Sequence, residues 1–224
     1  MQRAMQDYLK AVQLLSERGA RVTTSMLAAK LGVKPSSATV MMKKLAALRP
    51  RLLDYKSHQG VQLTKAGRRI ALDMIRRHRL LEQFLVVTLG FTWDEVHDEA
   101  ERLEHDVSDV FIERLDRFLE FPGWDPHGRP IPDRDGEIRA VIEVRLSDIK
   151  LNDTATVSSV GSEEPEFLRY LSQMGILPGV DIRVSEIAAV GNTLRIDVLA
   201  KKDFPAQYVV SASLADKIFV TPRA

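Results

Sequence analysis

Residues 23–48, T-T-S-M-L-A-A-K-L-G-V-K-P-S-S-A-T-V-M-M-K-K-L-A-A-L, decide the fold of the N-terminal part of the chain. Thr23 or Thr24 is placed to cap a short helix, because a threonine hydroxyl accepts from the free amides at a helix start. Gly32 ends that helix, and the turn G-V-K-P leads into a second one. Two short helices joined by a glycine-containing turn indicate a helix-turn-helix.

The second helix has two distinct faces. Ala38, Met42, Leu45 and Leu48 recur on one side and should pack inward. The turn and the opposite side carry hydroxyls, a small apolar side chain and ammonium groups, which can meet base edges, a thymine methyl or phosphates. The expected DNA contacts are Lys34, Pro35, Ser36, Ser37, Thr39, Val40, Lys43 and Lys44.

The flanking segments complete a winged helix-turn-helix. Residues 3–17 have the apolar spacing of a helix that precedes the motif. After it, L-L-D-Y-K-S-H-Q-G-V-Q-L indicates two short strands joined by a turn, with Lys56 and His58 near the tip of this wing. Both side chains are added to the expected DNA contacts.

The charge is divided sharply along the chain although its net value is only +1. Residues 1–80 hold 17 Lys and Arg against 4 Asp and Glu, while the remaining residues hold 15 against 27. The first part, at +13, favours a polyanion, since basic side chains on phosphates release condensed counterions. The acidic remainder, at −12, suits cations.

Composition excludes several classes of protein. With 224 residues and 45% hydrophobic content, the chain can bury a core, in two or three small domains rather than one. The absence of cysteine excludes disulfides, zinc fingers and thiolate ligands. Apolar runs are short and the N-terminus lacks an apolar signal core, so a cytoplasmic protein with no membrane partner is expected.

A second group of polar residues lies in V-H-D-E-A-E-R-L-E-H-D-V-S-D, residues 96–109. Apolar residues recur there at three- and four-residue steps up to Phe111, which predicts an unbroken helix over 96–111. At about 100° per residue, one stripe beside the buried face holds His97, Glu101, Glu104 and His105. The stripe is either a metal site that needs ligands from elsewhere or the solvated shoulder of an amphipathic helix.

The helix that begins near Thr64 adds His78 and Glu82, four residues apart on one face. Such a pair alone is usually a surface contact. Two neighbouring helices that offer imidazoles and carboxylates without sulfur suit Mn(II) or Fe(II) better than Cu(I) or structural zinc.

Beyond these helices the pattern changes. Residues 121–136, F-P-G-W-D-P-H-G-R-P-I-P-D-R-D-G, hold four prolines and three glycines, so regular structure should stop near 121 and resume near 137. The remainder alternates as β-strands do, interrupted by a helix at 165–173. A small C-terminal β-barrel is therefore predicted, in a chain that is otherwise mainly α.

The order of a basic winged helix, H-R-L-L-E, V-H-D-E-A-E-R-L-E-H and P-H-G-R-P-I-P resembles the diphtheria toxin repressor family of metal-dependent transcriptional regulators. L-S-Q-M-G-I-L-P-G-V-D-I-R-V also resembles the SH3-like domains of ferrous-iron transport accessory proteins. The resemblance implies a DNA-binding domain over 1–72, a helical dimerisation and metal-binding domain over 73–139, and an SH3-like domain over 140–224. It also implies a homodimer on palindromic double-stranded DNA.

The resemblance further implies a primary metal site at Asp7, Glu101, Glu104 and His105. Iron-responsive members carry Met and Cys where this chain has Asp7 and Glu101, whereas manganese-responsive members carry the acids. Carboxylate oxygens are harder ligands than thioether or thiolate sulfur, so they favour Mn(II) relative to softer ions. Lys10 stands where short manganese regulators have a glutamate and pair two manganese ions, which puts a binuclear site of that kind in doubt.

An ancillary site is implied at His78, Glu82 and His97, with Glu163 and Glu166 aligned by their spacing to F-L-R-Y-L. The two glutamates could instead be the acidic first turn of a helix, which the helix dipole favours.

Together these features predict a Mn(II)-activated regulator, with two ions per subunit, that represses metal-uptake genes; activation of other genes stays open. An Fe(II)-responsive member of the family and a metal-independent DNA-binding protein with a structural ion are the alternatives. A metal-dependent hydrolase is disfavoured because no nucleophile or oxyanion motif is recognisable. Neither enzyme activity nor a small organic substrate is expected.

Overall fold

A computed structural model describes residues 2–17, 21–56, 60–199 and 206–223. The chain forms two compact units. The first comprises residues 1–78, 104–107 and 132–138, and the second comprises residues 79–103, 108–131 and 139–224. The helix α4, Lys65–Leu89, belongs to both because its first part lies in one unit and its last part in the other.

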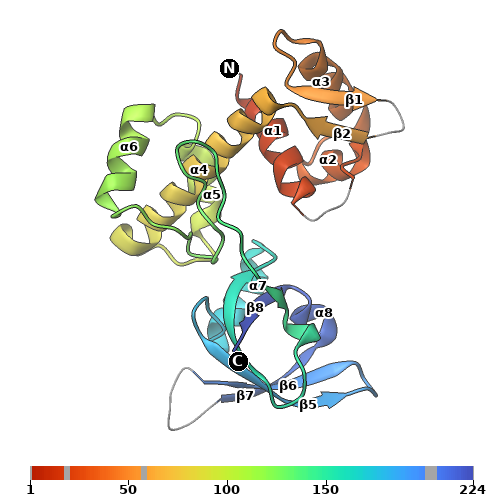
Figure 1. Ribbon diagram of the computed structural model, residues 1–224, viewed down its shortest axis with the longest axis vertical. Coiled ribbons are helices and arrows are strands. Elements are labelled where there is room, and N and C mark those ends of the chain that lie inside the picture. Colours follow the sequence, from red (N-terminus) through yellow and green to blue (C-terminus); the bar gives the residue numbers. More distant parts are fainter. Residues whose placement is uncertain (1, 18–20, 57–59, 200–205, 224) are drawn as a thin grey trace. The chain divides into compact units, whose positions relative to one another are not determined.

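The first unit contains the winged helix-turn-helix (Figure 1). Its elements are α1 Arg3–Ser16, α2 Thr24–Lys30, α3 Pro35–Ala47, β1 Leu53–Lys56 and β2 Gly60–Leu63. The strands pair antiparallel, with Leu53 opposite Leu63. Side chains from all three helices and both strands meet in one core, including Leu9, Leu27, Met42, Leu45 and Leu53. The predicted fold of this part is confirmed.

Local chemistry fixes the turn between α2 and α3. The Thr23 hydroxyl accepts from the Met26 amide at 3.2 Å, which satisfies one free donor at the start of α2. Gly32 has φ +63°, a conformation that glycine adopts without steric cost, and Pro35 opens α3. The inner face of α3 buries Ala38, Met42 and Leu45, as its spacing predicts.

The prediction of an unbroken helix over 96–111 is wrong. The structure has α5, Val96–Leu103, then a turn, then α6, Asp109–Phe118. The Ser108 hydroxyl accepts from the Phe111 amide at 3.1 Å and starts α6 as a separate helix. Glu104 and His105 therefore lie in the turn rather than on a helical stripe.

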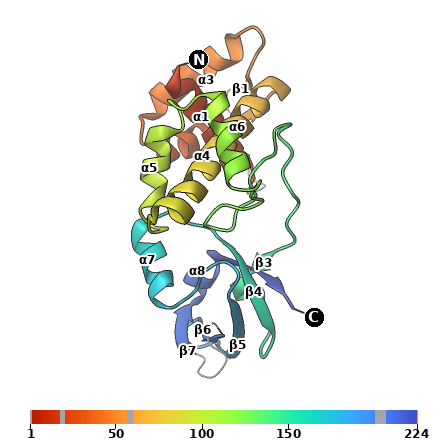
Figure 2. The same ribbon diagram turned by 90° about the vertical axis from the view of Figure 1, so that its left-hand side faces the viewer.

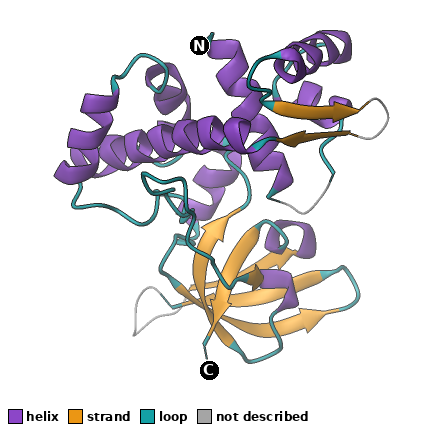
Figure 3. Cartoon of the chain, turned by 45° about the horizontal axis from the view of Figure 1, so that its top comes forward, coloured by secondary structure: helices purple, strands orange, loops and turns teal. Residues whose placement is uncertain are grey.

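The second unit contains a six-stranded antiparallel sheet of order β3-β8-β4-β5-β6-β7 (Figures 2 and 3). Its strands are β3 Val144–Arg145, β4 Thr154–Val160, β5 Asp181–Ala188, β6 Thr193–Val198, β7 Ala206–Ser211 and β8 Ile218–Pro222. The short helix η1, Leu146–Asp148, with α7, Pro165–Gln173, and α8, Ala212–Ala215, completes it. The β-rich C-terminal domain is confirmed, although its first strand begins at Val144 rather than near 137.

Trp93, just before α5, belongs to the same core as the sheet. Its indole N–H donates to the Leu168 carbonyl of α7 at 3.2 Å. This contact holds the start of α5 against the β-rich part of the second unit. Within the described residues, no helix is long and apolar enough to cross a bilayer.

Candidate functional site

Three of the four predicted primary ligands meet in the first unit. Asp7 lies on α1, and Glu104 and His105 lie in the turn after α5. The Nε2 atom of His105 is 2.7 Å from Asp7 Oδ1 and 3.6 Å from Glu104 Oε1. Ligand atoms from the three side chains all lie within 4.8 Å of one another, a spacing that one metal ion can span.

A hydrogen bond orients the His105 ring toward this cluster. Its Nδ1 lies 3.1 Å from the amide oxygen of Gln6, which can only accept, so Nδ1 carries the proton. Nε2 is thus directed at Asp7. Burial raises the pKa of Asp7, and the neighbouring His105 offsets only part of this effect. A half-buried carboxylate beside an imidazole nitrogen fits a divalent ion, whose charge would favour the ionised Asp7.

Glu104 has a second set of partners. Lys10 Nζ is 2.7 Å and 3.0 Å from the two carboxylate oxygens, and His78 Nδ1 is 2.6 Å from Oε2. All three residues are buried. Burial acts to raise the pKa of Glu104, but the hydrogen bond from His78 and the charge of Lys10 outweigh it and hold the pKa below its usual value. Glu104 is therefore an ionised carboxylate that already has a cation beside it.

The fourth predicted ligand, Glu101, lies on α5 in the second unit. Its side chain is 55% exposed, and its Oε1 lies 3.8 Å from His97 Nε2. A role for Glu101 in the primary site stays a prediction.

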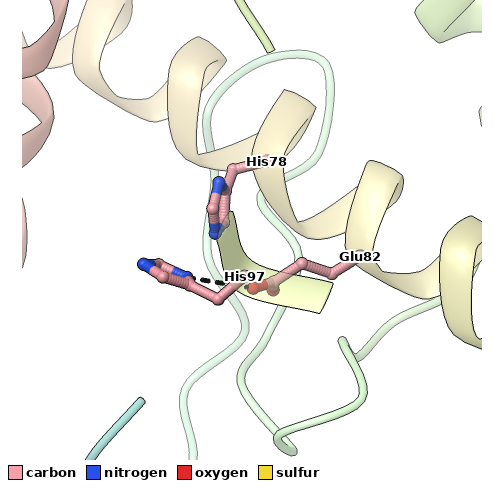
Figure 4. A group of neighbouring side chains, drawn as sticks. All are labelled: His78, Glu82 and His97. Carbon is pink, nitrogen blue, oxygen red and sulfur yellow. Dashed lines mark hydrogen bonds and ion pairs between the residues drawn. The ribbon is translucent and has the colours of Figure 1, made fainter. Parts of the chain in front are cut away.

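A second cluster surrounds Glu82 of α4. Its Oε1 is 3.3 Å from His97 Nδ1 on α5, and His97 Nε2 is 3.6 Å from Glu163 Oε2. Figure 4 shows that His78 lies one helical turn before Glu82 on α4 and that the Glu82 carboxylate points toward His97. The structure thus brings His97 next to Glu82 and Glu163 next to His97, although the three come from distant parts of the sequence.

Two residues of the predicted linker, Asp125 and His127, lie beside this cluster. His127 Nδ1 is 3.8 Å from Glu82 Oε2, and Asp125 Oδ2 is 3.5 Å from Arg79 Nε. Glu82, Asp125 and His127 are buried, and their ligand atoms lie within 4.8 Å of one another. This group is a candidate cation site in its own right.

The His127 ring has a defined orientation. Its Nε2 lies 2.8 Å from the Trp93 carbonyl, which can only accept, so Nε2 is the donor and Nδ1 faces Glu82. The ring also stacks on the Trp93 indole, with centroids 5.7 Å apart. Burial works to lower the pKa of His127, but Glu82 and Asp125 outweigh it and raise the pKa. A second hydrogen bond that fixes the tautomer is common in metal-binding histidines.

Backbone hydrogen bonds hold the turn that carries His127. The Asp125 carboxylate accepts from the backbone amides of His127 at 2.8 Å and Arg129 at 2.9 Å. Gly128 has φ +81°, and a Cβ there would lie 1.9 Å from the Ser158 carbonyl of β4. The sequence offers one indication of this site. The chain has only five histidines, and one of them, His127, lies in the proline- and glycine-rich segment 121–136.

Glu166 lies apart from these residues. It is exposed in the first turn of α7 and joins none of the metal-ligating groups that the described residues form. Glu163 instead pairs with the Arg129 guanidinium. A role for Glu166 as a ligand stays a prediction.

The expected DNA contacts lie on the surface of the first unit. The side chains predicted to face the groove are exposed at Lys34, Pro35, Ser36, Ser37, Val40, Lys43, Lys44 and Lys56. Val40 is 67% exposed. The half-buried Thr39 donates its hydroxyl to the Pro35 carbonyl. His58 lies outside the described residues.

Three family models match the chain in succession. Residues 1–61 match the iron dependent repressor, N-terminal DNA binding domain. Residues 64–133 match the iron dependent repressor, metal binding and dimerisation domain, and residues 144–222 match the FeoA domain.

Individual relatives span most of the chain. The iron-dependent repressor IdeR of Mycobacterium leprae is 29% identical over 84% of this chain and 86% of its own. The HTH-type transcriptional regulator MntR of Oceanobacillus iheyensis is 31% identical over 68% of this chain and 96% of its own. A solved manganese-dependent transcriptional repressor in complex with manganese is 40% identical, with TM-score 0.90 over 98% of this chain and 100% of that one. The manganese regulator SloR is 33% identical, with TM-score 0.77 over 98% of each chain.

Proposed function

The chain belongs to the iron-dependent, or diphtheria toxin, repressor family of metal-dependent transcriptional repressors, and on that premise we propose that Mn(II) activates it. It carries the C-terminal FeoA domain and is a repressor rather than an enzyme. Its DNA-binding and dimerisation domains imply DNA and a second copy of the chain as partners.

The donor set of the primary site supports Mn(II). Asp7, Glu104 and His105 offer oxygen and imidazole nitrogen, and the whole chain has no cysteine. Hard oxygen ligands favour Mn(II) over softer ions relative to sites that contain thiolate. Glu101 would add a third carboxylate to the set. Fe(II) is the closest alternative because the same donors suit it.

The observation that carries the proposal is the meeting of α1 with the turn after α5. Asp7 lies on the first helix of the DNA-binding part, whereas Glu104 and His105 lie almost a hundred residues further along. A bound divalent ion supplies a charge that these donors share. Asp7 and Glu104 would otherwise repel each other. By holding one ion together, they would restrict where α1 lies and would favour the arrangement that fits two operator half-sites.

The second cluster would hold another ion. Glu82, His97 and His127 direct a carboxylate and two imidazoles toward one another, with Glu163 beside His97. Asp125 contributes negative charge to the same region. We therefore propose two ions per subunit. Among the donors expected for the second ion, His127 replaces Glu166. His78 contacts Glu104 of the primary cluster.

The remaining parts of the proposal follow from the premise. The chain would act in the cytoplasm as a homodimer on a palindromic operator and repress metal-uptake genes. Its domains would be 1–72 for DNA binding, 73–139 for dimerisation and metal binding, and 140–224 for the SH3-like part.

Operator affinity of the wild type and of Asp7→Ala, with and without Mn(II), tests the switch. Mn(II) should tighten wild-type binding by about 5–150-fold, the range of typical allosteric coupling, and Asp7→Ala should lose most of this effect. Asp73→Ala is a matched control, because this acid is exposed on α4 and pairs with Arg77 instead. Normal Mn(II) activation of Asp7→Ala would contradict the proposal.

The same assay separates the alternatives. Titration with Fe(II) and Zn(II) in parallel distinguishes a manganese sensor from an iron sensor by the ion that activates at the lowest free concentration. Equal operator affinity of wild type with and without any ion would select a DNA-binding protein with a structural ion.

A further inference from the structure

Glu163 is a carboxylate expected in the second cluster, but its closest contact is with an arginine. Its Oε1 pairs with the Arg129 guanidinium, and the two side chains are largely buried, at 18% and 21% exposed. A guanidinium stays protonated in proteins, so this oxygen faces a permanent positive charge. The proposed function gives Arg129 no role.

Arg129 also connects two segments of the second unit. Its Nη2 donates to the Val160 carbonyl at 3.2 Å, and the Val160 amide donates to the His127 carbonyl at 3.2 Å. These bonds join the turn that carries His127 to the end of β4. The pair with Glu163 extends the same connection toward α7, so it is part of how the FeoA domain holds this turn.

The other oxygen of Glu163 faces an imidazole rather than a group of ligand atoms. His97 Nδ1 lies 3.3 Å from Glu82 Oε1 (Figure 4), whereas His97 Nε2 lies 3.6 Å from Glu163 Oε2. An imidazole binds an ion through one nitrogen, and the other nitrogen usually donates its proton to a carboxylate or carbonyl. Among the described residues, Glu163 joins none of the groups whose ligand atoms lie within 4.8 Å of one another.

We propose that Glu163 is a positioning residue for the second ion and not one of its ligands. One carboxylate oxygen accepts the Nε2 proton of His97, which directs Nδ1 toward Glu82, while Arg129 neutralises the other oxygen. The inference rests on the proposed function and deepens it, because it concerns which side chains hold the second ion. It replaces the ligand role that the family resemblance implied for Glu163.

Charge favours this arrangement. A divalent ion on Glu163 would lie against the guanidinium or displace it, and a buried guanidinium without its partner is strongly unfavourable. With Glu163 as a proton acceptor, the pair with Arg129 stays intact. A carboxylate on the Nε2 proton also makes Nδ1 of His97 the more basic donor. The same residue thus strengthens the site without binding the ion.

The test separates a ligand from a proton acceptor at one position. It uses the full-length chain with Asp7→Ala, so that the second cluster is the remaining proposed ion site. Equilibrium dialysis measures the Mn(II) affinity, and electron paramagnetic resonance measures the zero-field splitting, which reports the ligands. Glu163→Gln keeps an acceptor toward His97 and should retain most of the affinity with an unchanged splitting. Glu163→Ala should weaken binding by about 10–100-fold, as loss of an outer partner does.

Two variants calibrate the measurement. Glu82→Gln removes a proposed ligand and should both weaken binding and change the splitting. Glu164→Gln is the matched control, because it removes the same charge from the adjacent, exposed side chain and should change neither quantity. A Glu163→Gln variant that loses as much affinity as Glu82→Gln, or shows an altered splitting, would overturn the inference.

The charge left on Arg129 is handled by a second variant. Should Glu163→Gln not fold, Arg129→Gln combined with Glu163→Gln removes both charges and keeps amides that can hydrogen-bond, and the same two outcomes decide. If Asp7→Ala with Glu163 intact binds no Mn(II), the second ion of the proposed function fails and the inference fails with it. Binding by that parent together with loss in Glu163→Gln overturns the inference alone.

Discussion

At the scale of single residues, the His127 ring lies between a hydrogen-bond acceptor, the Trp93 carbonyl, and a carboxylate, that of Glu82. The Trp93 carbonyl takes the Nε2 proton, and Glu82 lies opposite Nδ1. In the metal-free protein a second proton on Nδ1 is favoured by the two buried carboxylates, Glu82 and Asp125. A divalent ion bound at the proposed site would therefore compete with this proton for the same place.

The first prediction concerns pH. Because the folded-state pKa of His127 is raised, its contribution to stability is fully present below the ordinary histidine value and is lost as pH rises through the folded-state pKa. In chelator, His127→Gln should therefore destabilise the protein more at pH 6 than at pH 9, as measured by urea unfolding. An equal loss of unfolding free energy at both pH values would contradict this assignment.

The second prediction concerns Glu101. This carboxylate stands where iron-responsive members of the family carry cysteine. Glu101→Cys introduces a thiolate, which should increase the affinity for Zn(II) relative to Mn(II) because sulfur is the softer ligand. Competitive titration of the two ions against purified protein measures the ratio. Glu101→Gln, which removes charge without adding sulfur, is the control and should weaken binding of both ions.

At the scale of elements, the break between α5 and α6 changes what each residue can reach. Periodicity alone cannot separate one long helix from two short ones when the apolar spacing continues across the gap. Ser108 starts the second helix as its N-cap, because its hydroxyl accepts a hydrogen bond from the Phe111 amide. A serine at this position is a helix-start signal that can be recognised in the sequence. As a result Glu104 and His105 leave the helical surface and turn toward α1.

The third prediction concerns α3. Lys43 is exposed on the face opposite the buried side chains of this helix. If it contacts a phosphate, Lys43→Ala should weaken operator and non-specific binding alike and reduce the slope of log affinity against log salt by about 1. Fluorescence anisotropy over a salt series measures both effects. Lys150→Ala, exposed in the second unit, should leave the slope unchanged.

At the scale of the whole molecule, both clusters join segments that are far apart in the chain. The primary site links α1 to the turn at 104–107, and the second links α4, α5, the 125–129 turn and Glu163. Ligands drawn from several segments are assembled only in the folded state. Metal binding should therefore stabilise the fold as a whole rather than one helix.

The fourth prediction follows from this linkage. With free Mn(II) at a hundred times the dissociation constant, each occupied site should add about 2.7 kcal/mol to the free energy of unfolding. Asp7→Ala should lose the stabilisation that Mn(II) gives at the primary site and keep the stabilisation from the second site. Denaturant unfolding at fixed free Mn(II) measures the difference. An Asp7→Ala protein stabilised as much as the wild type would show that Asp7 holds no ion.

The sequence by itself determined most of the elements and the chemistry that they carry. The Thr23 cap, the spacing of α3 and the four-residue step from His78 to Glu82 depend only on neighbours along the chain. The division of charge likewise needs no coordinates. These features follow from short-range rules of helix geometry and from composition, so they could be predicted.

Only the tertiary structure decided which donors meet. Asp7 reaches His105, Lys10 reaches Glu104, and His127 reaches Glu82 across separations that no local rule covers. The last contact depends on the close approach of Gly128 to β4, and a linker pattern of prolines and glycines does not reveal it. Packing of distant segments sets side-chain direction, and direction determines which carboxylates and imidazoles can share an ion.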